Sequence, residues 1–335
     1  MQINFAINGL GRIGRCVLRA YFENSYPSLN LAAINLSTQI DDFITLIKYD
    51  SVHGKFKHDV QILGDDLVID NHKIKIFNSR DPKQIKWGKE NIKVVLECTG
   101  AFKDKESCSF HLGESVKKVL ISAPSPDADA TIVFGVNDNI LAKEHQIISV
   151  GSCTTNALAP LAKIIDENFG INSGYMTTIH AYTNDQNLVD SRHKDIRRSR
   201  AAALSMIPTS TGAAKAIGLV LPQLNGKLSG SAVRVPTPNV SMVDLVVNTK
   251  TECSIKAVNE AMLLGCKTSL KGVMDYAESE LVSIDFNHDS HSVVFDPFET
   301  SVTNGNLLRV VGWYDNEWGF SCRMLDLASL MNKFL

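Results

Sequence analysis

The first 151 residues alternate short apolar runs with segments of helical periodicity. The runs are rich in Ile, Val and Leu, and they lie at residues 3–7, 29–35, 92–100, 117–124 and 145–151. Between the first two runs, Ile13, Val17 and Tyr21 recur at the spacing of one helix face. Continuous apolar strands separated by helices are typical of a parallel sheet covered on both faces. This region is therefore expected to be a doubly wound α/β domain.

The pattern of apolar runs along the sequence changes from Tyr175 onward. The later apolar runs are longer and rich in Val and Thr, and they lie at residues 175–183, 229–249 and 305–316. This pattern favours a mainly antiparallel sheet and predicts a second, α+β domain at 152–317. At the end of the chain a helix is expected over 318–335, and its apolar face carries Phe320, Met324, Leu327 and Met331.

Composition narrows the classes of partner. The chain has 44% hydrophobic and 21% charged residues, the balance of a globular protein with room for two domains. Its formal net charge is −2 and its dense basic run, 192–200, is local, so nucleic acid is not an expected partner. No apolar stretch approaches the ~20 residues of a membrane span and no leader pattern opens the chain, which predicts a cytoplasmic protein without membrane contact. Seven scattered cysteines without a CxxC pair predict reduced thiols and no metal site.

Gly9, Gly11 and Gly14 form a GxGxxG motif between the first strand and the first helix. In a dinucleotide-binding turn the first glycine permits the tight bend, the second lets the backbone approach a pyrophosphate, and the third allows close helix packing. The phosphates then bind at the helix N-terminus, where N–H groups and the dipole favour negative charge. The alternative is a glycine turn that binds nothing, because the motif alone is weakly specific.

Cys153 begins an apolar helical segment directly after the run 145–151. A thiol at a helix N-terminus is stabilised as a thiolate, which makes Cys153 a candidate nucleophile. His180 ends a later predicted strand and is a candidate base that can also return a proton. The alternatives are a small buried cysteine and a histidine satisfied by its surroundings. Hydroxyl and guanidinium groups suited to phosphate oxygens follow at 197–200, 209–212 and Arg234.

Seven segments occur in order over essentially the whole chain: NGLGRIGR, KYDSVHG, SCTTNALAP, HAYTNDQ, RAAALSMIPTSTGAAKAIGLVLPQLNGKL, VRVPTPNVS and WYDNEWGFS. Together they resemble the phosphorylating glyceraldehyde-3-phosphate dehydrogenase family. The resemblance implies oxidation of glyceraldehyde 3-phosphate to 1,3-bisphosphoglycerate with NAD(P)+ and inorganic phosphate, a reaction of glycolysis and gluconeogenesis. It makes Cys153 the nucleophile that forms a hemithioacetal and then a thioester, and His180 the base that lowers the thiol pKa.

The resemblance also assigns the binding residues. The C3 phosphate of the substrate is expected to meet Thr183, Asp185 and Arg234. The attacking phosphate is expected to meet Ser152, Thr154, Arg198, Thr211 and Gly212. The residues expected to contact the cofactor are Gly9, Gly11, Arg12, Ile13, Gly14, Asn35, Leu36, Ser37, Thr38, Ser122, Arg192 and Asn316.

The same resemblance implies a Rossmann-type dinucleotide-binding domain at 1–151 that the helix 318–335 returns to complete. It also implies a homotetramer, in which the loop at about 183–203 lines the cofactor groove of a neighbouring subunit.

The stretch LAAINLSTQ, residues 31–39, lacks the acidic residue that usually holds the adenosine ribose in NAD-specific members. Leu36 occupies that position, and Ser37 and Thr38 offer hydroxyls to a 2′-phosphate. Where NAD-specific relatives have Leu-Pro, the later loop has a serine followed by Arg192. NADP is therefore favoured, with NAD as the second candidate. The alternative is that Leu36 packs against adenine and Arg192 faces solvent, which leaves a weak NAD enzyme.

Two other functions are compatible with the same fold. The sister enzyme that oxidises erythrose 4-phosphate shares the nucleophile, although its loop generally lacks AYTND and TSTGAA. A non-catalytic NAD(P)-binding protein has no need of Cys153, His180 and two phosphate sites. Turnover of the two aldehydes, and cofactor reduction with added phosphate, separate these alternatives.

Overall fold

The computed structural model describes residues 2–38, 40–113 and 115–335. Gln39, the last residue of the stretch 31–39, lies outside the described residues, as do Met1 and Glu114. The chain divides into two compact units: the first holds the residues up to 134 with 138–151 and 321–335, and the second holds 135–137 and 152–320.

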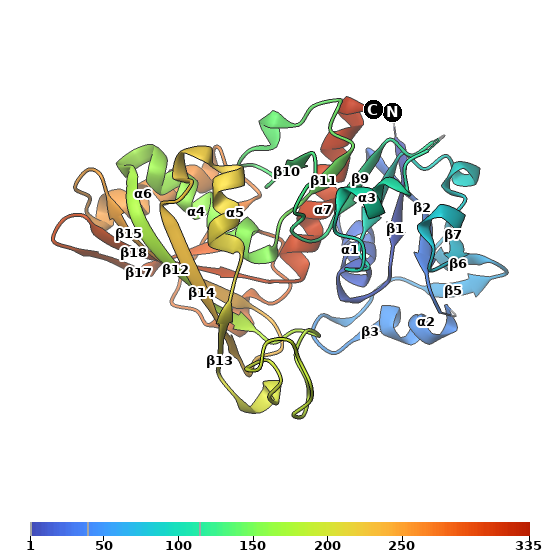
Figure 1. Cartoon of the computed structure of the whole chain (residues 1–335), viewed down its shortest axis with the longest axis horizontal. Helices are drawn as coiled ribbons and strands as arrows, with labels where there is room; N and C mark the ends of the chain where they lie inside the picture. The colour runs from blue at the N-terminus through green and yellow to red at the C-terminus, as the bar shows by residue number, and fades with distance from the viewer. Residues whose placement is uncertain (1, 39, 114) are drawn as a thin grey trace. The chain divides into compact units, whose positions relative to one another are not determined.

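The first unit is built on a nine-stranded sheet (Figure 1). In spatial order its strands are β10 (Ala130–Thr131), β11 (Ile147–Ser149), β9 (Lys118–Ile121), β8 (Val94–Glu97), β1 (Ile3–Asn8), β2 (Leu29–Leu36), β7 (His72–Asn78), β6 (Asp66–Ile69) and β5 (Val60–Leu63). All neighbours from β10 to β7 are parallel, which confirms the doubly wound sheet expected from the apolar runs. Strands β5 and β6 add an antiparallel extension that the sequence analysis did not predict.

Four helices belong wholly or partly to this unit: α1 (Arg12–Glu23), α2 (Asp41–Lys48), α3 (Lys105–Ser109) and α7 (Trp318–Met331). A short antiparallel pair, β3 (Tyr49–Asp50) and β4 (Gly54–Lys55), follows α2. The predicted apolar face of the terminal helix is confirmed, because Met324, Leu327 and Met331 are fully buried.

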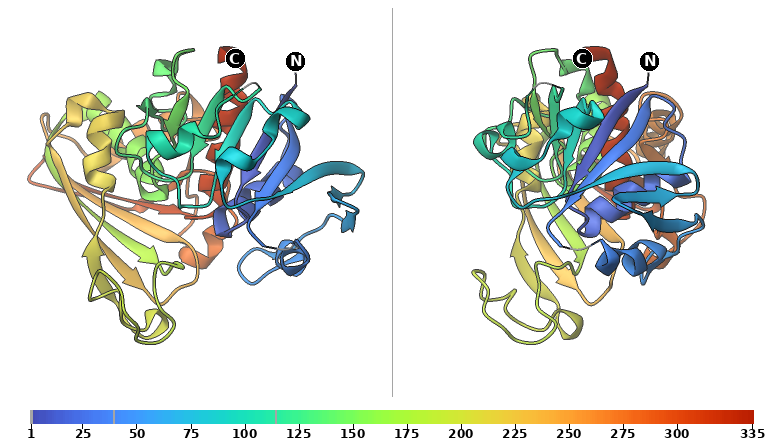
Figure 2. Two further views of the ribbon diagram at one scale, coloured as in Figure 1. Left: turned by 45° about the vertical axis from the view of Figure 1, so that its right-hand side comes forward. Right: turned by 90° about the vertical axis from the view of Figure 1, so that its right-hand side faces the viewer.

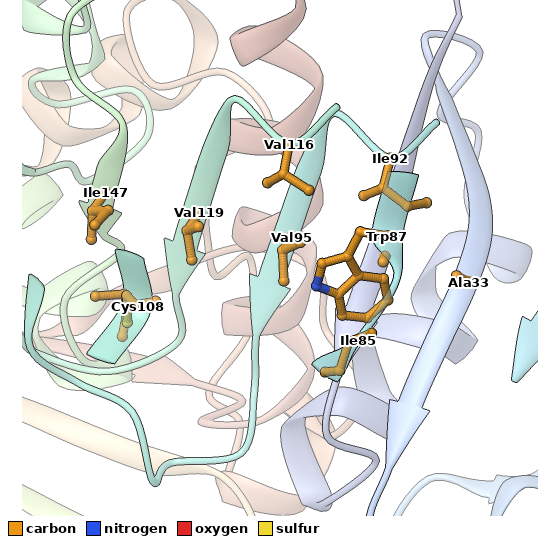
Figure 3. Packing of buried hydrophobic residues seen from close by; sticks show 11 residues of the cluster. Ala33, Ile85, Trp87, Ile92, Val95, Cys108, Val116, Val119 and Ile147 are labelled. Carbon is orange, nitrogen blue, oxygen red and sulfur yellow. The ribbon is translucent and has the colours of Figure 1, made fainter. Parts of the chain in front are cut away.

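Apolar side chains from neighbouring parallel strands form the core on one face of the first sheet. Figure 3 shows Val95, Val119 and Ile147 on β8, β9 and β11, with Trp87 and Ile92 packed beside them. These residues are β-branched or aromatic and have little or no exposed surface, as expected for strands covered on both sides.

The second unit is built on a seven-stranded sheet. In spatial order its strands are β13 (Ile207–Ser210), β14 (Leu228–Val235), β12 (Ile171–Ala181), β15 (Ser241–Thr249), β18 (Leu307–Tyr314), β17 (Val293–Thr303) and β16 (Met274–Tyr276). Four of the six neighbouring pairs are antiparallel, which confirms the mainly antiparallel sheet; β12 with β14 and β16 with β17 are parallel. Strict alternation of buried and half-buried residues along β15 shows that one sheet face is the more deeply covered.

Three helices pack on this sheet: α4 (Cys153–Phe169), α5 (Ala213–Val220) and α6 (Ile255–Lys267) (Figure 1). Between β12 and β13, residues 182–206 leave the sheet as a long loop, drawn in yellow-green in Figures 1 and 2. Among the described residues, no helix has the length and apolar character needed to cross a membrane.

Candidate active site

The first unit has a cavity of ≈ 410 Å³ at the carboxyl ends of its central strands. It lies where β1 is flanked by β2 on one side and β8 on the other, the position at which the strand order reverses and α/β sheets bind ligands. Its lining residues are Asn8, Gly9, Leu10, Gly11, Asn35, Leu36, Ser37, Phe43, Ser79, Arg80, Pro82, Ile85, Thr99, Ala101 and Phe102.

The three glycines meet the requirements of a dinucleotide turn. Gly9 has φ +94°, and a Cβ there would lie 2.8 Å from the Thr99 Cγ2 atom. A Cβ on Gly14 would lie 1.9 Å from the Gly9 carbonyl oxygen, so only glycine lets α1 pack on the turn. Gly11 lines the cavity with open space where a side chain would project. The residues present therefore fit a dinucleotide whose backbone contact is at Gly11.

The structure places five of the predicted cofactor residues in the cavity wall and the others outside it. Those in the wall are Gly9, Gly11, Asn35, Leu36 and Ser37; those outside it are Arg12, Ile13, Gly14, Thr38, Ser122, Arg192 and Asn316. Leu36 is buried and ends β2, so the position without an acid faces the cavity. Sequence reasoning missed Arg80 and Phe102, because no motif marks them and only the folding of the loops after β7 and β8 brings them here.

Arg12 takes part in an ion pair within the first unit. Both its terminal nitrogens donate to the Asp50 carboxylate, which also accepts from the backbone N–H groups of Val52 and His53 at 2.9 Å each. Burial acts to raise the pKa of Asp50, but the Arg12 and backbone donors outweigh it and hold that pKa well below its usual range. Asp50 belongs to the KYDSVHG segment, so this segment positions the first residue of α1.

Cys153 and His180 come together in the second unit. Ser152 caps α4 with its hydroxyl oxygen, which accepts from the Thr155 N–H at 3.0 Å, so Cys153 occupies the first helical position. The Cys153 Sγ atom lies 3.6 Å from His180 Nε2 at the end of β12. The opposite ring nitrogen, Nδ1, is 2.7 Å from the Ala181 carbonyl oxygen. Because a carbonyl only accepts, Nδ1 carries the proton and Nε2 is free to accept the thiol proton.

Burial and the Arg234 charge act on the pKa values of both members of this pair. Burial raises the pKa of the Cys153 thiol, although the Arg234 guanidinium acts against this rise. Burial, together with Arg234, lowers the pKa of His180 to about 3. Burial thus favours the neutral form of both groups, and stabilisation of a Cys153 thiolate by the helix N-terminus and His180 stays a prediction. A neutral imidazole offers a proton acceptor next to the thiol.

Tyr314 braces the pair, and sequence reasoning missed it. Its hydroxyl lies 2.9 Å from the hydroxyls of both Thr154 and Thr178, which flank Cys153 and His180 in their elements. Its ring packs edge-on against the His180 ring, with centroids 6.0 Å apart. Thr154 thus has its hydroxyl engaged with Tyr314, and its part in the predicted phosphate site falls to its N–H at the start of α4. The tyrosine of the WYDNEWG segment was the available signal.

Two arginines organise the predicted phosphate residues. Arg234 Nη1 donates to the Thr183 hydroxyl and to the Ala181 carbonyl, both at 3.1 Å. Two of the residues predicted to bind the C3 phosphate, Arg234 and Thr183, are therefore in contact. Arg198 pairs with Asp185 and donates from Nε to Thr209 at 3.0 Å. Asp185 and Arg198, which were assigned to different phosphates, therefore contact each other. This pairing offsets the charge of a carboxylate expected to repel phosphate.

The second unit also holds the remaining predicted residues Thr211, Gly212, Asn316 and Arg192. Thr211 and Gly212 precede α5, where the Thr211 hydroxyl accepts from the Ala213 N–H at 3.2 Å. Asn316 is buried and its Oδ1 accepts from the Ser241 hydroxyl at 2.8 Å, which leaves its NH2 group as the available donor. Arg192 is exposed on the loop 182–206.

A doubly wound sheet with a glycine-lined dinucleotide cavity, and a second unit that pairs a thiol with an imidazole, are the parts of an NAD(P)-dependent oxidoreductase. Residues 3–105 match the family model described as glyceraldehyde 3-phosphate dehydrogenase, NAD binding domain, and residues 152–316 match the model of the C-terminal domain. The chain belongs to the glyceraldehyde-3-phosphate dehydrogenase family. The resemblance found in the sequence is thereby confirmed.

Its relatives cover almost the whole chain. Glyceraldehyde-3-phosphate dehydrogenase 2 of Bacillus subtilis (strain 168) is 50% identical over 328 residues, which are 98% of this chain and 96% of the relative. The enzyme of Xanthobacter flavus is 48% identical over 333 residues, 99% of each chain. That of Geobacillus stearothermophilus is 48% identical over 330 residues, 98% of each chain.

Proposed function

We propose that the protein is a phosphorylating glyceraldehyde-3-phosphate dehydrogenase that works through a thioester on Cys153. The observation that carries this proposal is the 3.6 Å approach of the Cys153 thiol to the unprotonated Nε2 of His180. Two guanidinium groups, Arg234 and Arg198, act electrostatically on this histidine and suit a doubly phosphorylated product. Family membership and the relatives' names support the substrate class.

The residues divide the chemistry into two steps. Cys153 Sγ bonds to the aldehyde carbon as its proton passes to His180 Nε2 and on to the aldehyde oxygen, which gives a hemithioacetal. His180 takes the hydroxyl proton back as the carbon is oxidised to a thioester. Bound NAD(P)+ supplies the acceptor for the hydride that leaves that carbon. Phosphate then attacks the thioester carbonyl, the carbon–sulfur bond breaks, and the thiol regains a proton from His180.

An assay of cofactor reduction tests the reaction. With glyceraldehyde 3-phosphate and inorganic phosphate the protein should turn over continuously, whereas without phosphate it should stop after one thioester per site. Erythrose 4-phosphate should be the poorer aldehyde. Equal or better turnover of erythrose 4-phosphate favours the sister enzyme, and no reduction with either aldehyde favours the non-catalytic NAD(P)-binding alternative.

We further propose that residues 1–151, with the helix 318–335, form the cofactor domain, and that 152–317 form the catalytic domain. The cavity at Gly11 supports the first assignment and the Cys153–His180 pair supports the second. In the cavity wall, Leu36 and Ser37 occupy the position where a carboxylate would repel a 2′-phosphate. Arg80 also lines the cavity, and it is exposed with no acidic partner among the described residues. A cation and a hydroxyl at this end suit a 2′-phosphate, so we infer that NADP is preferred or at least used comparably to NAD.

We also infer a homotetramer in the cytoplasm. The loop 182–206 carries large apolar side chains that the chain itself leaves uncovered, among them Leu188, Leu204 and Met206, which are 75–85% exposed. Apolar groups gathered on one loop suit a contact with another subunit. The seven cysteines are free, which suits a reducing compartment.

A further inference from the structure

A buried carboxylate lies directly behind the proposed cofactor cavity without lining it. Glu97 is the last residue of β8, and its side chain has no exposed surface. Four residues linked to it by hydrogen bonds, directly or through at most two partners, do line the cavity: Asn8, Asn35, Ser79 and Thr99. The mechanism of aldehyde oxidation makes no use of this carboxylate.

Both carboxylate oxygens are occupied by donors from different elements. Oε1 accepts from the Thr99 N–H at 2.8 Å and from the Thr99 hydroxyl. Oε2 accepts from Asn8 Nδ2 at 2.5 Å and lies 3.1 Å from His111 Nε2. A site made of four donors requires four lone pairs, which a carboxylate has and an amide lacks.

Trp87 fixes which way the His111 ring is protonated. The Trp87 indole N–H donates to His111 Nδ1 at 3.1 Å. An indole N–H only donates, so Nδ1 has no proton, and the neutral ring carries its proton on Nε2, where it donates to Glu97. Trp87, a residue of the apolar core shown in Figure 3, thus makes His111 a donor to Glu97 without itself lining the cavity.

The contacts continue from Glu97 to the end of β2. Asn8 uses its amide NH2 on Glu97, which leaves its Oδ1 to accept from Asn35 Nδ2 at 2.6 Å. Asn35 in turn accepts from the Ser79 N–H at 3.0 Å and donates to the Ser79 carbonyl at 2.9 Å. Each amide has one orientation that satisfies its neighbours, and Glu97 at one end and the Ser79 backbone at the other favour the same orientations. The chain of bonds ends beside Leu36.

We propose that Glu97 is a positioning residue for cofactor binding: it holds Thr99 against the Gly9 turn and, through Asn8, holds Asn35 at the ribose end of the cavity. The proposal rests on the assignment of this cavity to the cofactor. It requires no contact between Glu97 and the dinucleotide, and it concerns affinity for the cofactor rather than the chemistry at Cys153.

The Glu97→Gln variant tests this role because it keeps the shape of the side chain. Wherever its NH2 group is placed, it faces a donor: the Thr99 N–H on one side, or Asn8 and His111 on the other. A buried donor left without an acceptor is costly, so the Kd for NADP+ and for NAD+ should rise about tenfold or more. The kcat at saturating cofactor and the KM for the aldehyde should change far less than the Kd.

Ile92→Ala is the matched control, because it removes buried apolar atoms from the same core and leaves Trp87 and all four donors on Glu97 in place. The Kd of each cofactor for both variants is measured by fluorescence titration, with thermal unfolding of each recorded in parallel. A tenfold rise confined to Glu97→Gln supports the proposal. An equal rise of the Kd in both variants means that loss of core stability is the cause, which overturns the proposal. An unchanged Kd in Glu97→Gln overturns it as well.

A third variant separates failure of the proposal from failure of the cavity assignment. Gly11→Val projects a side chain into the open space of the cavity wall, and it should abolish binding of both cofactors. If Gly11→Val binds cofactor normally, the cavity is not the cofactor site and the role of Glu97 falls with it. If Gly11→Val abolishes binding while Glu97→Gln leaves it unchanged, only the role of Glu97 is refuted.

Discussion

The Cys153 Sγ atom lies 3.6 Å from His180 Nε2, and the proton of the imidazole is held on the other nitrogen by the Ala181 carbonyl 2.7 Å away. In the neutral imidazole, Nε2 therefore faces the Cys153 thiol as a proton acceptor. This arrangement ties nucleophilic attack to a proton transfer over one hydrogen bond, and several of its consequences are measurable.

Cys153→Ser should bind cofactor with normal affinity and form no acyl-enzyme. Serine keeps the place at the start of α4 but is a much weaker nucleophile beside a base whose pKa is lowered to about 3. Mass spectrometry after mixing with the aldehyde and cofactor should show the thioester on the wild type alone. Near-normal turnover by the serine variant would rule out the proposed mechanism.

Arg234→Met should make the Cys153 thiol less acidic. Burial raises the pKa of this thiol and the Arg234 charge opposes the rise, so removal of the charge raises the pKa further. A rise of one pKa unit lowers the thiolate fraction about tenfold at a fixed pH. The alkylation rate with iodoacetamide, measured from pH 6 to 10 without substrate, should therefore move to higher pH. Arg309→Met, which removes the Arg309 pairs with Asp244 and Glu299, should leave the profile in place.

His180 should give the free energy of unfolding a distinct pH dependence. Its pKa is about 3 in the folded protein against 6.5 ordinarily, so the unfolded chain binds the extra proton between these values. Stability is then fully present above pH 6.5 and is lost as the pH falls, by at most about 1.4 kcal/mol per pH unit. His180→Gln lacks this loss. Urea unfolding at pH 5 and pH 7 should show the smaller decrease in the variant, and equal decreases would contradict a buried neutral imidazole.

Leu36→Asp should shift cofactor preference toward NAD. A carboxylate in the cavity wall repels a 2′-phosphate and accepts bonds from ribose hydroxyls, whereas Leu36→Asn matches its shape without the charge. Charge-assisted bonds are worth roughly 1.5–3 kcal/mol, about 10- to 150-fold, so the ratio of kcat/KM for NADP over NAD should fall at least tenfold in the aspartate variant. Arg192→Pro should weaken NADP selectively. A wild type that prefers NAD by more than tenfold would refute NADP use.

The protein should sediment as a species near four times 36.8 kDa at low micromolar concentration. Leu204→Glu puts a charge on one of the most exposed apolar side chains of the loop 182–206 and should shift the protein to smaller species. Leu264→Glu on α6 changes an exposed leucine outside the loop and should sediment like the wild type. An active monomeric wild type would contradict the assembly.

Local rules account for what the sequence predicted well. The Gly9 turn and the Gly14 contact depend on neighbours a few residues away, and the apolar runs mark strands whatever their partners are. The places of Cys153 and His180 in predicted elements made them a candidate nucleophile and base, and the family resemblance assigned their roles. The hairpin of β5 and β6 was not predicted, because each strand has only four residues, too few for an apolar pattern to stand out.

The contacts that the sequence did not predict join residues that are far apart along the chain. Glu97 meets Asn8 across 89 residues, and Arg12 meets Asp50 across 38. A buried carboxylate carries no periodic signal, and its donors become its neighbours only after the sheet has formed. The pKa of Cys153 is a related case, since the helix position is local but the burial that raises the pKa is a property of the folded unit.

The two hydrogen bonds of the Tyr314 hydroxyl have a consequence for the folding of the chain during its synthesis. Its hydroxyl meets Thr154 across 160 residues and Thr178 across 136, so both bonds await the synthesis of β18, long after the nucleophile and the base have left the ribosome. Pairing at such separations is slow, since a long loop must close before any contact repays it. A nascent chain therefore carries Cys153 and His180 without the two Tyr314 bonds. These bonds form only when β18 has joined the sheet, near the end of translation.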